Sequence, residues 1–216
     1  MMMKKINLFL YFFTKRLIDI LISVLALLVA APILIVTAIA IGIDTRGPVI
    51  FSQTRVGKEG KHFKLLKFRS MIPDAEKILY ENPKLLAEYQ KHSYKIFADP
   101  RVTNVGKHIR RYSIDEFPQF INVLKGEMSF VGPRAYRPEE LRDQQNNFPE
   151  TKKYVKAFLE VKPGITGPWQ VSGRSEIQFD KRVKMDAFYA ERKSLLYDFI
   201  IILKTPLAVV KGKGAV

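Results

Sequence analysis

Residues 17–43 read LIDILISVLALLVAAPILIVTAIAIGI, and this stretch decides the architecture of the chain. It is apolar except for Asp19, Ser23, Thr37 and single Gly and Pro residues. As a helix of about 27 residues it would extend roughly 40 Å, which exceeds the hydrocarbon core of a bilayer, about 30 Å. We therefore predict that it lies in a membrane.

Three arrangements of this helix agree with the sequence. Val29-Ala30-Ala31 offers small residues to a signal peptidase, but Pro32 directly after them argues against cleavage. A spanning helix would keep the preceding basic residues in the cytoplasm and export the rest of the chain. A re-entrant helix would enter and leave one leaflet, with a kink at Pro32, where proline removes a backbone hydrogen bond.

Basic residues lie on both sides of the helix. The net charge of +15 calls for an anionic partner, either nucleic acid, anionic lipid headgroups or phosphorylated small substrates. Residues 45–216 carry 32 of the 36 Lys and Arg residues, and Arg46, Arg55 and Lys58 follow soon after the helix. Both flanks therefore look cytoplasmic, although proline is also tolerated in spanning helices, so both geometries stay open.

The available residue types exclude several kinds of site. Cysteine is absent, which excludes disulfides, thiolate nucleophiles and Cys-ligated zinc. His62, His92 and His108 stand in unrelated contexts without the spacing of a histidine-built metal centre. Any metal must therefore be held by oxygen ligands.

The remainder predicts an α+β fold, a helix-rich globular domain with a short antiparallel β-hairpin. Residues 48–53 and 61–68 are β-prone runs around a Gly-containing loop. Residues 74–97 read as two amphipathic helices interrupted at Asn82-Pro83. Residues 195–210 are apolar but cut by charges and a proline, which fits an interfacial helix or a buried core helix.

The stretch RRYSIDEFPQFINVLKG, residues 110–126, is the most informative for chemistry. Its apolar spacing predicts a helix that starts between Ser113 and Asp115 and stops at Gly126, with Ser113 and Glu116 at capping-box positions. Asp115 and Glu116 would then lie at the positive end of the helix dipole, where phosphate also binds. Two carboxylates there could simply complement the dipole.

Neighbouring cations favour phosphoryl transfer instead. Arg110 and Arg111 precede the acidic pair, and Arg134 follows Gly-Pro in a loop. An aspartate can attack phosphorus and form an acyl phosphate if cations neutralise the phosphate oxygens. Mg²⁺ is the natural metal, because it binds one or two carboxylates together with substrate phosphates, and Glu116 is the nearest ligand.

Several ordered motifs together resemble a known family. They are KRLID at 15–19 before the apolar helix, FSQTRVG at 51–57, KFRSM at 67–71, the acidic pair, SFVGPR at 129–134, KPGITG at 162–167 and QVSGR at 170–174. From about Lys15 to its end the chain resembles the monotopic phosphoglycosyl transferases, also called bacterial sugar transferases. That resemblance implies the re-entrant form of the membrane helix.

The resemblance also implies a reaction. Asp115 would attack the β-phosphate of a UDP-sugar, release UMP and pass the sugar phosphate to polyprenyl (undecaprenyl) phosphate, as the first membrane step of polysaccharide or glycoconjugate assembly. Glu116 would help to hold Mg²⁺. Further candidates for contacting phosphates or uridine are Lys67, Arg69, Arg111, Arg134 and Arg174, with Asp186 as an additional acidic candidate. The motif at 170–174 favours a hexose, glucose or galactose, over an N-acetylated sugar.

The resemblance implies that residues 1–46 form the N-terminal segment and a re-entrant helix in the membrane. It also implies that residues 47–216 form a catalytic domain with interfacial helices, on the cytoplasmic face of the bacterial inner membrane. Membrane lipids are expected partners. Nucleic acid is not, since no recognised nucleic-acid motif is present. A non-catalytic basic membrane adaptor is the alternative, and the oligomeric state, a dimer included, stays open.

Overall fold

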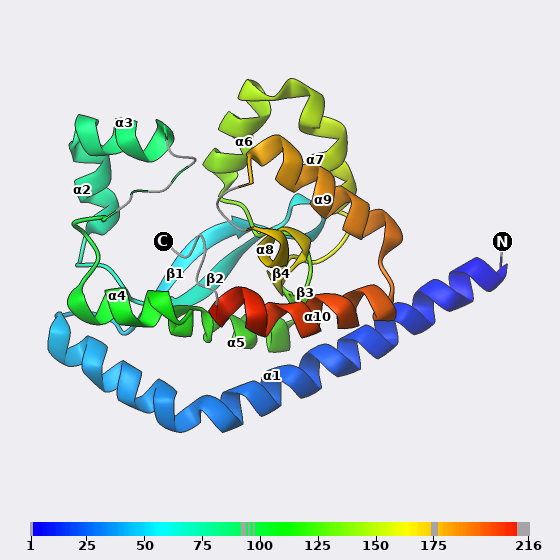
Figure 1. The fold of residues 1–216 in the computed structure, drawn as a ribbon, viewed down its shortest axis with the longest axis horizontal. Coiled ribbons are helices and arrows are strands. Elements are labelled where there is room, and N and C mark those ends of the chain that lie inside the picture. Colours follow the sequence, from blue (N-terminus) through cyan, green and yellow to red (C-terminus); the bar gives the residue numbers. More distant parts are fainter. Residues whose placement is uncertain (1, 92–93, 95, 97, 174–176, 211–216) are drawn as a thin grey trace.

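The computed structural model describes residues 2–91, 94, 96, 98–173 and 177–210 as a helical domain seated on one long helix (Figure 1). An antiparallel hairpin crosses the middle of this domain, which confirms the predicted α+β class. The elements are α1 (Met2–Asp44), β1 (Ile50–Val56), β2 (His62–Phe68), α2 (Ala75–Glu81), α3 (Pro83–Lys91), α4 (Asn104–Arg111), α5 (Gln119–Lys125), β3 (Ser129–Val131), α6 (Pro138–Asn147), α7 (Lys152–Phe158), β4 (Gly164–Thr166), α8 (Pro168–Ser172), α9 (Phe179–Arg192) and α10 (Leu195–Val210). Short 3-10 turns are η1 (Lys58–Gly60), η2 (Ile114–Glu116) and η3 (Pro149–Thr151).

The predicted hairpin and helix pair are both confirmed. β1 and β2 pair from Ile50 opposite Phe68 to Val56 opposite His62, and η1 lies in the turn between them. α3 begins at Pro83, so the interruption between the two helices falls where expected. Proline is tolerated in the first turn of a helix and disrupts its interior.

A parallel pair of strands, β3 and β4, was not predicted. Ser129 lies opposite Gly164 and Val131 opposite Thr166. The backbones approach closely just beyond the pairing, because a Cβ built on Gly164 would overlap the backbone nitrogen of Gly132. Only glycine fits there, because a side chain would collide with the opposing backbone. The two glycine-containing loops therefore lie directly against each other.

α1 is a continuous helix of 43 residues, and Figure 1 shows that it bends in its middle part along the lower side of the domain. Pro32, where a kink is expected, lies inside α1, and the helix continues through it. Among the described residues, α1 is the one helix long and apolar enough to cross a membrane by length and composition, and only 11% of its most apolar window is buried.

The N-terminal arm of α1 is fixed to the domain by polar contacts. The Arg16 guanidinium donates to carbonyls in the last turn of α5, where the helix dipole favours a cation. The buried Asp19 carboxylate accepts from Ser129 Oγ at 2.7 Å and from Phe130 N at 2.9 Å. These contacts explain why a charged residue stands in the apolar helix.

The C-terminal arm of α1 returns to the same domain. Ile41 packs in a buried cluster with Phe68 of β2 and Ile109 of α4. Beyond the helix end, Arg69 donates to the Thr45 carbonyl at 2.6 Å. Because both arms contact one domain, both ends of α1 lie on the side where that domain lies, which is the geometry of a re-entrant helix.

Replacing Asp19 with Ala is expected to lower the free energy of unfolding by roughly 2–3 kcal/mol, because two buried donors lose a charged acceptor. Denaturant unfolding of the detergent-purified protein measures this. Glu88→Ala on the exposed side of α3 is the matched control and should change the value by less than about 0.5 kcal/mol. Equal effects of the two substitutions would contradict the role of Asp19 in holding α1.

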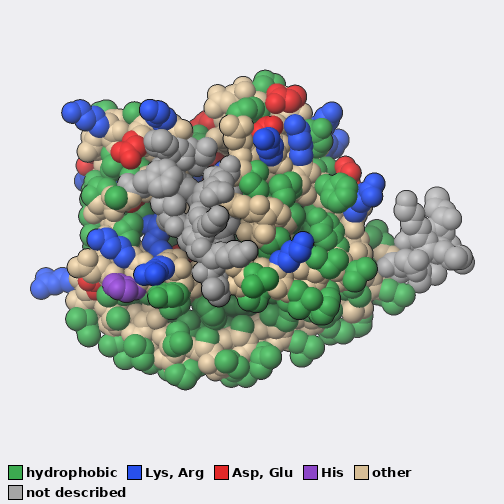
Figure 2. All heavy atoms as spheres, viewed as in Figure 1, with side chains coloured by type: hydrophobic (Ala, Val, Ile, Leu, Met, Phe, Trp, Pro, Cys, Tyr) green, Lys and Arg blue, Asp and Glu red, His purple; other side chains and the backbone are tan. Residues whose placement is uncertain are grey.

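α10 has one side buried in the domain and one exposed apolar side. Its Asp198 and Ile201 are buried in the domain, whereas Leu196, Phe199 and Leu203 are exposed. Figure 2 shows hydrophobic side chains along the lower edge of the molecule, where α1 runs, with Lys and Arg side chains on the body above it. An apolar exposed surface of this kind marks an interaction with a membrane or another protein.

Candidate functional site

A cavity of about 1120 Å³ contains both predicted catalytic carboxylates. Its walls come from the β1–β2 hairpin, η2, α8, α10 and the segment that follows α1. Elements distant in the sequence therefore meet around Asp115 and Glu116.

Asp115 and Glu116 lie in the 3-10 turn η2 rather than in α5. The expected helix start between Ser113 and Asp115 is wrong, because α5 begins at Gln119. The capping box is also wrong, since Ser113 has a φ of 56° and its side chain makes no cap hydrogen bond. Pro118 lacks the amide hydrogen that an α-helical bond to residue 114 needs, so tighter i→i+3 bonds form instead. The stop at Gly126 is confirmed, with a φ of 82°.

A buried amide brings η2 beside β2. Asn122 of α5 is fully buried, and its Oδ1 accepts from Leu66 N at 2.9 Å while its Nδ2 donates to the Lys64 carbonyl at 2.7 Å. β2 pairs with β1, and these bonds satisfy further backbone groups of β2 in place of another strand. They also fix the distance between α5 and the hairpin. Sequence reasoning missed Asn122, although a polar residue in the middle of an apolar helical stretch was a usable signal.

Lys67 of β2 bridges the acidic pair. Its Nζ lies 2.7 Å from Glu116 Oε1 and 3.5 Å from Asp115 Oδ2. The Asp115 side chain is 10% exposed and the Glu116 side chain 39% exposed. Both carboxylates therefore lie beside one cation, and Asp115 is the more sheltered of the two.

Burial raises the pKa of the Asp115 carboxyl above its ordinary value. The Lys67 ammonium opposes this rise in pKa, and the neighbouring Glu116 carboxylate adds to it. A carboxylate in a cavity whose pKa is perturbed by burial and a specific charged partner is a candidate for catalysis.

Arg134 faces the same cavity from the loop after β3. Its guanidinium carbon lies 5.2 Å from the centre of the Trp169 ring, and both residues line the cavity. Its backbone N–H donates to Asp186 Oδ2 at 3.2 Å. Asp186 is fully buried, does not line the cavity, and has its pKa raised to about 7 by burial. Asp186 is therefore placed to hold the Arg134 loop rather than to touch a ligand in the cavity.

The other basic candidates lie in different surroundings. Arg69 lines the cavity, but its guanidinium donates to the carbonyl of Thr45, the residue that follows α1 in the sequence. Arg111 is exposed and outside the cavity, whereas Arg110 lines it. Arg174 lies outside the described residues. Arg110 is thus the member of the predicted Arg110–Arg111 pair that the cavity includes. Further cations that line the cavity, none of them predicted to bind substrate, are Arg46, Arg55, Lys77, Arg101 and Arg137.

The acidic side chains at the cavity fit a metal ion whose coordination is completed by phosphate oxygens of the substrate. Within residues 2–91, 94, 96, 98–173 and 177–210, no three or more His, Asp or Glu side chains gather as a metal site. Asp115 and Glu116 supply hard carboxylate oxygens at the cavity wall. Mg²⁺ is commonly bound through one or two carboxylates and phosphate oxygens, so the residues present agree with it.

Comparison with known proteins agrees with the sequence motifs. The profile of a family described as bacterial sugar transferase matches residues 10–212. An undecaprenyl-phosphate galactose phosphotransferase of Salmonella typhimurium is 41% identical over 207 residues, which cover 94% of this chain and 42% of the relative. An N-acetylgalactosaminephosphotransferase acting on undecaprenyl phosphate in Aeromonas hydrophila is 38% identical over 95% of this chain and 45% of the relative.

Length differs among these relatives. The chain spans less than half of the Salmonella and Aeromonas proteins. In contrast, it spans 88% of the exopolysaccharide production protein ExoY of Sinorhizobium fredii, with 36% identity over 94% of this chain.

Proposed function

Because this chain belongs to the bacterial sugar transferase family, we propose that it transfers a sugar 1-phosphate from a UDP-sugar to polyprenyl (undecaprenyl) phosphate and releases UMP. The observation that carries the proposal is the sheltered Asp115 carboxylate, placed beside Lys67 and Glu116 in a cavity of about 1120 Å³. Small-molecule sites commonly measure about 300–1,000 Å³, so this cavity has room for a nucleotide sugar.

The transfer proceeds in two displacements at phosphorus. In the first, an oxygen of ionised Asp115 forms a bond to the β-phosphorus, and the bond from that phosphorus to the bridging oxygen breaks, so UMP leaves with the electron pair. In the second, an oxygen of polyprenyl phosphate attacks the same phosphorus, and the Asp115 carboxylate leaves. Splitting a difficult transfer into two easier steps is the usual gain from covalent catalysis.

Fixed cations supply the electrostatic part of this mechanism. Lys67 lies against both carboxylates, and the Arg134 guanidinium is held over Trp169 in the same cavity. Both charges are in place before a phosphate arrives, which lowers the cost of reorganisation in the transition state. Asp186, bonded to the Arg134 backbone, serves as a positioning residue.

Mg²⁺ is the proposed cofactor, held by Glu116, the more open carboxylate of the pair. It would neutralise phosphate oxygens when bound. EDTA treatment of the purified protein is therefore expected to lower UMP release by at least about 10²-fold, within the range found when a main electrostatic contact is removed. Added Mg²⁺ should restore the rate. Full activity in EDTA would contradict a metal requirement.

The proposed location is the cytoplasmic face of the bacterial inner membrane, with residues 1–46 as the membrane unit and 47–216 as the catalytic domain. Both arms of α1 contact the domain, and its outer side exposes residues such as Leu21, Leu28 and Ile39. A helix that dips into one leaflet holds the cavity at headgroup level, where a soluble nucleotide sugar can meet a lipid phosphate.

The sugar is proposed to be a hexose, galactose or glucose, in line with the name of the Salmonella relative. To test the reaction, purified protein is incubated with Mg²⁺, polyprenyl phosphate and, in parallel, UDP-galactose, UDP-glucose and their N-acetylated counterparts. UMP release and a polyprenyl-diphosphate sugar are expected with one hexose donor. Turnover only with an N-acetylated donor would correct the sugar, and no UMP with any donor would favour a non-catalytic adaptor.

A further inference from the structure

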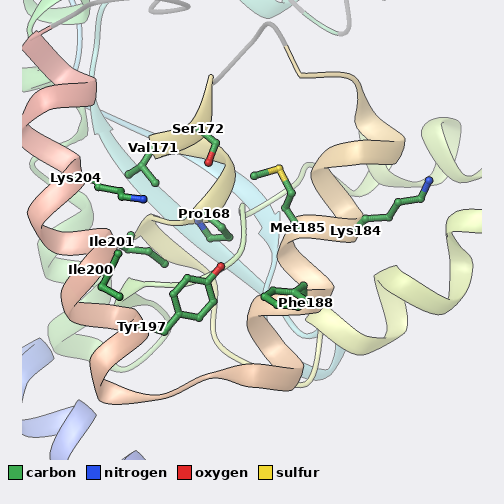
Figure 3. A pocket seen from close by; sticks show the side chains of 10 residues that line it. All are labelled: Pro168, Val171, Ser172, Lys184, Met185, Phe188, Tyr197, Ile200, Ile201 and Lys204. Atoms are coloured by element: carbon green, nitrogen blue, oxygen red, sulfur yellow. The ribbon is translucent and has the colours of Figure 1, made fainter.

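A second cavity, of about 390 Å³, lies between α8, α9 and α10 (Figure 3). None of its lining residues lines the cavity that contains Asp115. Its volume falls within the range of about 300–1,000 Å³ that is usual for small-molecule sites. It is therefore a separate place at which a ligand could bind.

The walls of this cavity are mainly apolar. Val171 comes from α8, Met185 and Phe188 from α9, and Ile200 and Ile201 from α10. No acidic side chain lines it among the described residues. Such walls favour an occupant with a hydrocarbon part and disfavour a cationic one.

One cation reaches into the cavity. Figure 3 shows the Lys204 side chain extending from α10 toward Val171, with the Tyr197 ring on the same helix below it. The Lys204 ammonium makes no hydrogen bond or ion pair with any residue that the structure describes. Lys184, in contrast, points away and lies 3.5 Å from the Asp180 carboxylate. Lys204 is thus positioned to meet an anion at the rim.

The rim borders the exposed apolar side of α10. Residues 197, 200, 201 and 204 fall on one side of this helix, and the exposed Leu196, Phe199 and Leu203 fall on the next side, about 100° around the axis. α10 is joined to α1 where Lys15 Nζ lies 3.0 Å from Asp198 Oδ2. The cavity therefore opens beside the surface that would meet the membrane.

We propose that this cavity holds part of an acyl chain of an anionic phospholipid from the surrounding bilayer, with the lipid phosphate against Lys204. The apolar walls match the chain, and an ammonium without a protein partner matches the phosphate. The occupant is not the reacting lipid, because the cavity is separate from the one that contains Asp115. The inference rests on the proposed membrane location and not on the transfer chemistry.

The test uses the full chain in nanodiscs that contain phosphatidylglycerol carrying a diazirine on its acyl chain. After photolysis and digestion, label is expected on α9 at Met185 or Phe188, which face the cavity. Lys204→Glu should lower α9 labelling about fivefold, the effect of one basic residue near an anionic surface. Lys181→Glu, on the exposed side of α9, is the matched control and should leave labelling unchanged.

Two results would overturn the proposal. One is labelling of α1 without labelling of α9, since label on α1 reports that the protein is in the bilayer. The other is equal α9 labelling by a diazirine phosphatidylcholine, with no loss in Lys204→Glu. UMP release measured on the same nanodiscs reports the transferase independently, so failure of the lipid site and failure of the proposed function give different outcomes.

Discussion

Asp115→Asn is expected to lower UMP release by at least about 10³-fold, because an amide cannot form the acyl phosphate through which the sugar phosphate passes. The side chain keeps its shape, so the cavity should stay intact. Initial rates with saturating UDP-sugar measure the effect. Asp180→Asn is the matched control, since Asp180 lies on α9, pairs with Lys184 and does not line the Asp115 cavity.

The same substitution is expected not to destabilise the fold. Burial raises the pKa of Asp115 above its unfolded value, so the ionised carboxylate costs stability once the pH exceeds that unfolded value. Asn removes this cost, and the Tm of the variant near neutral pH should equal or exceed that of the parent. A large fall in Tm would mean that lost activity reports unfolding rather than a missing nucleophile.

Lys67→Met is expected to lower the rate by about 10²–10³-fold, the range seen when one preorganised electrostatic contact is removed. Its ammonium lies 2.7 Å from Glu116 and 3.5 Å from Asp115, and methionine keeps an unbranched side chain, one atom shorter, without the charge. Lys64→Met is the control on the same strand, because Lys64 reaches the exposed Thr54 hydroxyl instead.

The pH dependence gives Lys67→Met a readout that general damage would not produce. Lys67 lowers the pKa of Asp115, so its removal raises that pKa further. Since the attacking carboxylate must be ionised, the acidic limb of the pH–rate profile should move to higher pH. An unchanged acidic limb, together with an unchanged rate, would contradict the role assigned to Lys67.

Strong local patterns in the sequence predicted much of the fold. A long apolar run predicted α1, β-prone runs around a Gly-containing loop predicted the hairpin, and Pro83 marked the start of α3. β3 and β4 were missed because strands of three residues carry no readable period, and their pairing depends on glycines that permit close approach.

The sequence predicted which residues form the candidate site better than it predicted their local conformation. Asp115, Glu116 and Lys67 were singled out and do lie together. The 3-10 turn was missed because the positive φ of Ser113 depends on the tertiary structure, and the capping-box pattern does not reveal it. The carbonyl partner of Arg69 was missed for a similar reason, since it belongs to Thr45, just after the end of α1 and 24 positions away in the sequence.

The most direct test of the covalent mechanism omits the lipid acceptor. Purified protein is incubated with Mg²⁺ and the UDP-hexose it turns over, quenched in acid, digested and analysed by mass spectrometry. The mechanism predicts a phosphohexose on the peptide that contains Asp115, lost when polyprenyl phosphate is added before quenching. Absence of any adduct, together with full turnover by an Asp115→Ala variant, would contradict it.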